Sequence, residues 1–177
     1  GEGSFYGCAL LKSIKLPNIT NVPYDAFANC KELESVDISN VTTIDKDAFY
    51  SCSSLKSINI PNVTTIDEYA FCNCSSLKSI SDLSNVKEIP RRAFDGCDSL
   101  KSINIPNVIT IGDEAFYGCA FDTIDLPKVE TIGIRAFTSC GNLKSINMPK
   151  VKTLGGMAFC YCAFDTIDLP KVETIGV

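Results

Sequence analysis

The sequence predicts an α/β solenoid, in which a unit of about 22 residues is repeated in tandem along a single array spanning residues 1–177. A phenylalanine recurs every 21 to 23 residues, a cysteine follows each one by three residues, and an alanine precedes seven of the eight. A fixed period of this length is typical of solenoids, where each repeat buries its apolar face only against its neighbours. The eight phenylalanines are Phe5, Phe27, Phe49, Phe71, Phe94, Phe116, Phe137 and Phe159.

The middle of each repeat predicts two short strands. Residues 58–60, Ile-Asn-Ile, alternate apolar and polar side chains, as a strand with one buried face does. Pro61 has no amide donor and ends this strand, and residues 63–66 form a second short extended segment. Equivalent strands of successive repeats then pair in a parallel sheet, about 4.8 Å apart.

The remainder of the repeat, for example residues 67–74, predicts a short helical turn. Asp at its start can cap a helix by accepting amide hydrogen bonds, and Pro is tolerated there because a first helical turn leaves its N–H groups unpaired. A set of glycines at one repeat position predicts turn residues with positive φ. The Asp and Pro residues are Pro23, Asp45, Asp67 and Pro90, and the glycines are Gly112, Gly133, Gly155 and Gly176.

Two irregularities interrupt the period. One extra residue falls near Ser81 and Asp82, and one residue is missing after Cys119. Both changes lie between the apolar positions of the repeat. We therefore expect them to bulge or tighten a turn without disturbing the core.

Composition excludes several classes of protein. With 45% hydrophobic and 21% charged residues, the chain has ample material for a core, which argues against disorder. A formal net charge of −5 argues against a nucleic-acid partner or an anionic membrane surface. No apolar run approaches the roughly 18–20 residues of a membrane helix, so we expect no direct membrane insertion.

The ten cysteines have two interpretations. Eight follow the repeat phase, which places them on the core side of the turn as free thiols. The alternative is disulfide pairing between neighbouring repeats, which is sterically feasible because the Cα atoms would be about 5 Å apart. We favour free thiols. Cys72 and Cys160 lie outside this phase and are expected to be more exposed.

Neither a metal site nor a catalytic site is predicted. The C-x-C pairs at residues 72–74 and 160–162 supply too few ligands for zinc, and the chain has no histidine. A cysteine nucleophile needs a base, usually histidine. Asp125 and Asp168 share a strand phase but would stand about 10 Å apart, on a solvated sheet face. We therefore predict no enzymatic activity and no cofactor.

The repeat carries a family resemblance. The pattern Leu-x-Ser-Ile-x-Ile-Pro-x-Val-x-x-Ile-x-x-x-Ala-Phe-x-x-Cys resembles the BspA-like, or Treponema pallidum type, class of leucine-rich repeats. The resemblance covers essentially the whole chain and implies a right-handed, curved leucine-rich-repeat solenoid with short strands on its concave face and helical turns opposite. Phe121 and Phe164 depart from the pattern, because they stand where the family has leucine.

The resemblance also implies a function. Many proteins of this class are surface or secreted proteins implicated in adhesion and in binding to host proteins. We expect a non-enzymatic binding module of a cell-surface or secreted protein, whose partner is a host surface or matrix protein, a microbial protein or a glycan. The alternative is a structural spacer that projects another domain. Residues 119–133 recur letter for letter at 162–176, and such recent duplication suits repeated contacts.

The concave face of the sheet is the candidate binding surface. In leucine-rich solenoids its outward side chains have no packing role. Here they are Ser, Thr, Asn, Asp and Lys, without Trp, Tyr or Arg, which usually anchor interfaces. Two other interpretations stay open: these residues only keep the sheet soluble, or tyrosines near the Ala-Phe turn, such as Tyr50 and Tyr69, make the contact. The candidate site residues are Lys56, Ser57, Asn59, Lys78, Ser79, Lys101, Ser102, Asn104, Asp125, Lys144, Asn147 and Asp168.

The two ends of the chain lie inside a repeat and carry no evident polar cap. Terminal units of a solenoid need such caps. We therefore expect a fragment of a longer array, with end-to-end self-association or capping by flanking sequence.

Overall fold

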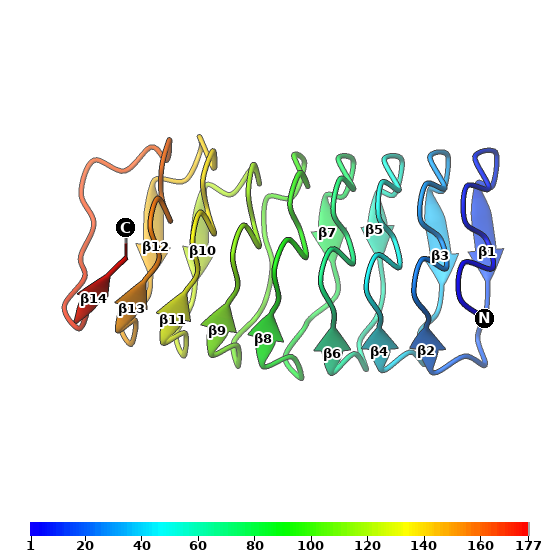
Figure 1. The fold of residues 1–177 in the computed structure, drawn as a ribbon, viewed down its shortest axis with the longest axis horizontal. Helices are drawn as coiled ribbons and strands as arrows, with labels where there is room; N and C mark the ends of the chain where they lie inside the picture. Colours follow the sequence, from blue (N-terminus) through cyan, green and yellow to red (C-terminus); the bar gives the residue numbers. More distant parts are fainter. Residues whose placement is uncertain (177) are drawn as a thin grey trace.

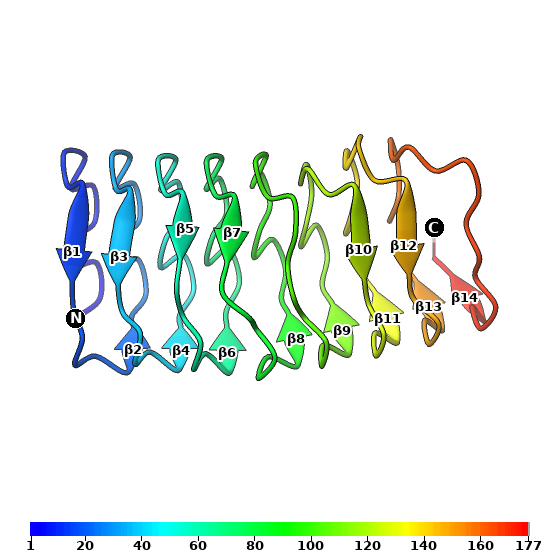
Figure 2. The same ribbon diagram turned by 180° about the vertical axis from the view of Figure 1, so that it is seen from behind.

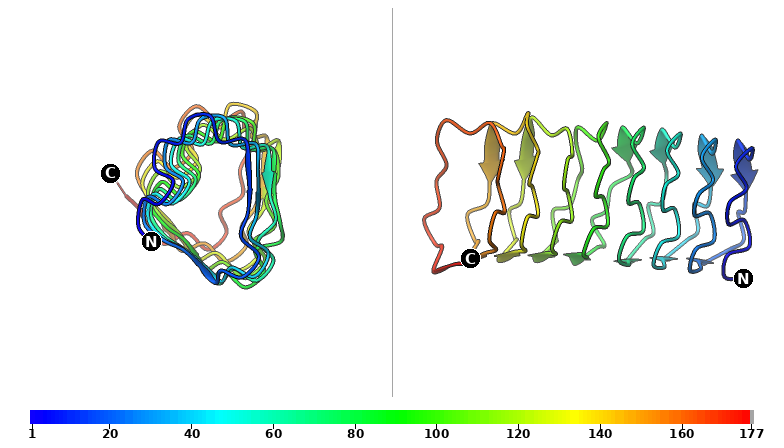
Figure 3. Two further views of the ribbon diagram at one scale, coloured as in Figure 1. Left: turned by 90° about the vertical axis from the view of Figure 1, so that its right-hand side faces the viewer. Right: turned by 45° about the horizontal axis from the view of Figure 1, so that its top comes forward.

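The computed structural model describes residues 1–176, which wind into a row of stacked turns (Figure 1). Seen along its axis, the chain traces a three-sided ring around one shared interior (Figure 3). Two sides carry short parallel strands, and the third carries the Ala-Phe-x-x-Cys segments. The row bends little in either of two opposite views (Figures 1 and 2), and the predicted parallel solenoid is confirmed.

The first side, which we call the first sheet, is built from the Ser-Ile type segments. Its pairs keep the repeat register, so that Ser13 faces Ser35, and Thr123 faces Ser145. Its strands are β1 (Ser13–Lys15), β3 (Ser35–Asp37), β5 (Ser57–Ile58), β7 (Ser79–Ile80), β10 (Thr123–Asp125) and β12 (Ser145–Asn147). In β3 and β10 the central residue is buried while both of its neighbours are exposed, and in the two-residue strands β5 and β7 the isoleucine is the less exposed residue.

The second side, the second sheet, is built from the Thr-Ile segments. Its strands are β2 (Asn21–Val22), β4 (Thr43–Ile44), β6 (Thr65–Ile66), β8 (Glu88–Ile89), β9 (Thr110–Ile111), β11 (Thr131–Ile132), β13 (Thr153–Leu154) and β14 (Thr174–Ile175). In the strands of this sheet from β2 to β13, the aliphatic residue of each pair is buried and the residue before it is more exposed, because side chains alternate along a strand, whereas Ile175 in β14 is exposed.

The third side, which we call the turn face, contains no helix within residues 1–176, so the predicted helical turns and the α/β class are wrong. An α-helix needs every amide to bond within its own segment. Here alternate amides do so: the Tyr50 amide donates to the Asp47 carbonyl at 3.0 Å, but the Phe49 amide donates to Ala70 of the next turn at 2.8 Å. The residues two before and two after each Phe also have positive φ, which a right-handed helix excludes.

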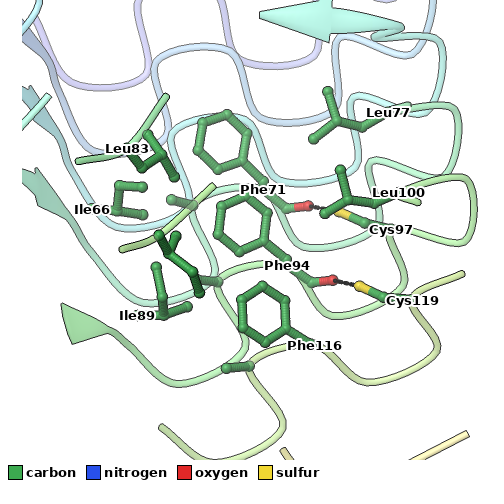
Figure 4. Packing of buried hydrophobic residues seen from close by; sticks show 14 of the residues in the cluster. Ile66, Phe71, Leu77, Leu83, Ile89, Phe94, Cys97, Leu100, Phe116 and Cys119 are labelled. Carbon is green, nitrogen blue, oxygen red and sulfur yellow. Dashed lines mark hydrogen bonds between the residues drawn. The ribbon is translucent and has the colours of Figure 1, made fainter. Parts of the chain in front are cut away.

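The interior is organised by the repeat phenylalanines. Their rings stack with centroids 5.2–5.5 Å apart and planes within 2–22° of parallel, the offset geometry that aromatic pairs prefer. Phe71, Phe94 and Phe116 form the central part of this column (Figure 4). The six phenylalanines from Phe27 to Phe137 in this column are almost completely buried.

The repeat cysteine completes the same core. The carbonyl of Phe71 accepts the amide of Cys74 at 3.2 Å and the thiol of Cys97, from the next turn, at 3.2 Å (Figure 4). Both lone pairs of a buried carbonyl are thereby used, which spares the cost of an unsatisfied acceptor. All ten cysteines are free thiols, as favoured from the sequence, but Cys8 in the first turn is exposed, so its predicted place on the core side is wrong.

Cys72 differs from its prediction, because it is buried with 4% of its surface exposed. It follows Phe71 directly, and the same position in other turns holds Ala28 and Thr138, which are buried too. A short side chain in this column lies below the surface of its larger neighbours. Cys160, at the same position, is half-buried.

The predicted positive φ at Gly112, Gly133 and Gly155 is also wrong, since their backbones are not left-handed. A Cβ on Gly155 would lie 2.4 Å from backbone atoms of Gly133 and Ile134 in the preceding turn. These positions need glycine because two backbones approach closely at this corner. Gly176 follows the same pattern with more room, because a Cβ there would lie 3.3 Å from its nearest neighbour, the amide nitrogen of Gly156.

The extra residue near Ser81 loosens the junction between the third and fourth turns. The Ser81 hydroxyl accepts the Ile60 amide at 2.8 Å, and no strand pairing links β6 to β8 in the described chain. Pro90 contributes to this gap, because the equivalent Asp67 amide donates to Ile44 at 2.9 Å and proline has no such donor. The insertion therefore opens the second sheet, which is more than a local bulge.

The missing residue after Cys119 is compensated by a larger side chain. Phe121 is fully buried and meets Phe116 edge-on at 5.5 Å, in the place that leucine fills in longer repeats. Phe164 meets Phe159 in the same way at 5.5 Å. The shortened turn thus keeps its interior filled.

Replacing Phe94 by Ala removes the middle of the ring column and leaves a cavity between two turns. We expect Phe94→Ala to lower the free energy of unfolding by about 3–5 kcal/mol in urea titrations. The exposed Lys101→Ala should change it by less than about 0.5 kcal/mol. Equal effects of the two substitutions would contradict the buried column.

Substituting a glycine by alanine tests whether the glycine is needed because two backbones approach closely or only because it lies in a turn. Gly155→Ala should cost about 1–3 kcal/mol of unfolding free energy, because the new Cβ meets backbone that cannot rotate away. Gly141→Ala is the matched control, since its Cβ would lie 3.9 Å from the nearest atom, and we expect it to be neutral to within about 0.5 kcal/mol. Thermal unfolding of both variants measures the difference.

Candidate functional site

The candidate residues on the first sheet all lie at the surface. Lys56, Ser57 and Asn59 flank the buried Ile58, and the same arrangement recurs at Lys78 and Ser79. The twelve residues predicted from the sequence are each exposed, and we call them together the polar strip. Their exposure follows from strand alternation, because the intervening Ile or Leu is the residue that packs inward.

The strand register brings some of the strip together. Ser57 pairs with Ser79, and Asp125 pairs with Asn147, whose amide donates to the Asp125 carboxylate at 2.6 Å. The Asn104 amide donates to Asp82 at 3.0 Å, which places Asp82 in this column although the insertion disturbs its phase. Amide and carboxylate groups therefore alternate from turn to turn.

Other strip residues are separated from these. Lys101, Ser102 and Asn104 belong to no strand, because the inserted and missing residues fall on either side of their turn. Asp168 also lies outside any strand, beyond β12. The strip is thus divided into one part along β5 and β7 and another along β10 and β12.

Charge pairs on the strip are exposed and weak. Lys56 Nζ lies 2.6 Å from Glu34 Oε2, and this hydrogen bond lowers the pKa of the Glu34 carboxyl below its ordinary value. Both side chains are about half exposed, so water and salt screen their attraction. The strip therefore offers many hydrogen-bonding groups and no deeply desolvated anchor.

A second cluster lies on the turn face around Tyr69, which the sequence offered as an alternative contact, whereas the cations around its ring were not predicted. The half-buried Tyr69 ring is flanked by Lys46 Nζ at 5.7 Å from the turn before, and by Arg91 Cζ at 5.6 Å and Arg92 Cζ at 5.8 Å from the turn after. These are cation–π distances. Arg92 also contacts the Glu114 carboxylate. The sequence did contain a signal that could have indicated this cluster, because arginine is not part of the repeat pattern and two of the arginines, Arg91 and Arg92, are adjacent.

The surroundings of the buried thiols keep them protonated and therefore unreactive as nucleophiles. Burial raises the pKa of Cys72 and of Cys140 to about 12, and it raises that of Cys74 and Cys97 well above the ordinary value near 9. A thiol is nucleophilic as its thiolate, which these surroundings disfavour. The cysteines therefore act as core side chains.

The described residues include no group of three or more His, Cys, Asp or Glu placed to hold a metal ion. Among residues 1–176, no helix has the length and apolar character to cross a membrane.

The sequence matches the profile described as BspA type leucine rich repeat region, in six copies covering residues 1–98 and 64–177. No protein with a curated functional description matches the chain.

Solved structures of similar shape are bacterial leucine-rich repeat proteins. A leucine-rich repeat protein from Bacteroides ovatus is 34% identical with a TM-score of 0.68, covering 93% of this chain and 39% of its own. One from Eubacterium ventriosum is 28% identical with a TM-score of 0.60, covering 93% and 41%. A leucine rich cell surface protein from Faecalibacterium prausnitzii is 22% identical with a TM-score of 0.57, covering 82% and 62%. The chain thus spans less than two thirds of each relative.

Alkaline pH should destabilise the array through its buried thiols. Above pH 9 the unfolded chain loses thiol protons that the folded chain keeps, so unfolding is favoured as pH rises toward 12. Cys72→Ala should flatten the dependence of unfolding free energy on pH between 9.5 and 11 by about 1 kcal/mol per pH unit. Ala28 already occupies the equivalent buried position, so this variant should fold.

The matched control for this pH dependence is Cys8→Ala, which removes an exposed thiol. In this variant, the unfolding free energy should depend on pH as steeply as it does in the wild type. The interpretation fails if both substitutions flatten the slope equally, or if neither does.

Proposed function

Because this chain belongs to the BspA-type leucine-rich repeat family, we propose that it is a non-enzymatic binding module that recognises a protein, or a glycan, through its repeated surface. The observation that carries the proposal is the polar strip, where exposed hydrogen-bonding side chains recur in register from turn to turn. Repeated weak contacts gain avidity when they engage one partner together. The strip residues have no role in the core, so they are free to make such contacts.

The proposal includes location and partner class. A cell-surface or secreted setting suits adhesion to a host or microbial partner, and the Faecalibacterium prausnitzii relative is described as a cell surface protein. End-to-end self-association belongs to the same proposal. An apolar hollow of 280 Å³ beside Phe5, Leu16 and Phe27 in the first turn supports it.

Binding to an immobilised panel of extracellular matrix proteins and to a glycan array tests the strip. Where saturable binding is found, the triple variant Asn59→Ala, Asn104→Ala, Asn147→Ala should weaken it about tenfold or more, because each amide contributes a separate hydrogen bond. These three side chains are exposed, so the variant should keep wild-type stability.

A control variant changes the second sheet instead: Thr65→Ala, Thr131→Ala, Thr153→Ala. It should bind as wild type does. Binding that survives the asparagine changes would remove the strip from the interface. Absence of binding to every panel member would favour the alternative function, a structural spacer, which the straight row of turns also suits (Figure 1).

A further inference from the structure

We propose that the turn face carries a second docking surface, centred on Tyr69 and Arg91, which receives a carboxylate-bearing segment of a protein partner. The inference rests on the proposed binding function and assigns its strongest anchor to a face other than the polar strip. Tyr and Arg are enriched among the residues that dominate interface energetics. The strip contains neither.

The distribution of these residue types over the three sides is uneven. All six tyrosines and all three arginines lie within three residues of a repeat phenylalanine, on the turn face. Within that face, Tyr69 is the ring around which several cationic side chains gather. The cluster lies near the middle of the array, and interface anchors concentrate near the centre of the surface they serve.

The fold does not require these side chains. Tyr69 occupies a position with φ of 59°, and the equivalent residues in the neighbouring turns, Asp47 and Arg92, also have positive φ. The turn therefore accepts a short acid, a long cation or an aromatic ring at this position, and its geometry does not require tyrosine.

Arg91 and Arg92 differ in how their charges are balanced. Arg92 contacts Glu114 and lies 3.6 Å from Asp95, so its charge is balanced within the array. Arg91 is exposed and forms no ion pair in the described chain; its guanidinium lies over the Tyr69 ring instead. The cation–π attraction to the ring favours this place for the guanidinium. A guanidinium binds a carboxylate through two parallel hydrogen bonds.

The surface beside the cluster is hollowed. The gap between β6 and β8 opens a polar hollow of 430 Å³, lined in part by Glu68 and Pro90, which are the chain neighbours of Tyr69 and Arg91. The carboxylates of this hollow, such as Glu68 and Glu88, disfavour a uniformly acidic ligand there. The partner segment therefore places one carboxylate on Arg91 while its neighbouring residues are neutral or basic.

A random twelve-residue peptide display library, selected against the full chain, tests the proposal. Selected peptides should carry an Asp or Glu, and their synthetic versions should bind Arg91→Ala and Tyr69→Asn about tenfold or more weakly than wild type. Tyr69→Asn keeps a residue suited to positive φ, and urea unfolding checks that both variants fold. Arg91→Lys should recover only part of the affinity, because an ammonium cannot make the paired contact.

The matched control is Arg135→Ala, an exposed arginine on the same face that has no tyrosine partner. It should bind the selected peptides as wild type does. Peptides whose binding depends on Asn59, Asn104 and Asn147 instead would overturn the turn-face site while leaving the binding function in place. Peptides that bind Arg91→Ala as tightly as wild type, or no enrichment at all, would also overturn it.

Discussion

The carbonyl of the repeat phenylalanine is the group on which the array depends most. It accepts the amide of the cysteine three residues later and the thiol of the cysteine one turn further on, so it ties a turn to itself and to its neighbour. Because the phenyl ring of the same residue stacks on the next ring, one residue fixes both the rise and the rotation between turns. The strands on the other two sides follow this spacing.

This dependence explains why the first and second sheets can break without dividing the array. At the junction between the third and fourth turns β6 and β8 are unpaired, yet the Phe71 amide still donates to Ala93 at 2.9 Å. The turn face and the β5–β7 pairing of the first sheet both continue across that junction. A solenoid is held by nearest-neighbour contacts, so two intact sides with a filled core maintain the stack where the third side is open.

The repeat phase was enough to predict the buried phenylalanines, the inward isoleucines and the exposed strip, because period and alternation dictate those orientations. The helical turn was mispredicted because Asp67 and Pro90 are equally typical of helix caps and tight turns, and only contact with the next turn decides between them. The role of the repeat glycines was mispredicted for a similar reason, because a positive φ and a close approach of two backbones, as at Gly155, both require glycine.

The site could be predicted in part. The strip follows from strand alternation, but its division does not, since it depends on how the Ser81 hydroxyl replaces a carbonyl in the ladder. Tyr69 was an alternative contact in the sequence, but the cations around it escaped prediction because the members of the cluster come from three turns and meet only through their side-chain conformations. Departures from a repeat consensus deserve more weight than the consensus when function is sought, because the consensus mostly encodes packing.

Residue-resolved hydrogen exchange is the most direct measurement of this hierarchy. The amides of Phe71 and Phe94, which bond to the next turn, should exchange only through global unfolding, while those of Lys87 and Lys101, which lie outside strands and have no backbone acceptor in the described chain, should exchange orders of magnitude faster. Protection that is strong at Lys87 and Lys101 but weak at Phe71 and Phe94 would contradict the phenylalanine ladder as the element that holds the turns together.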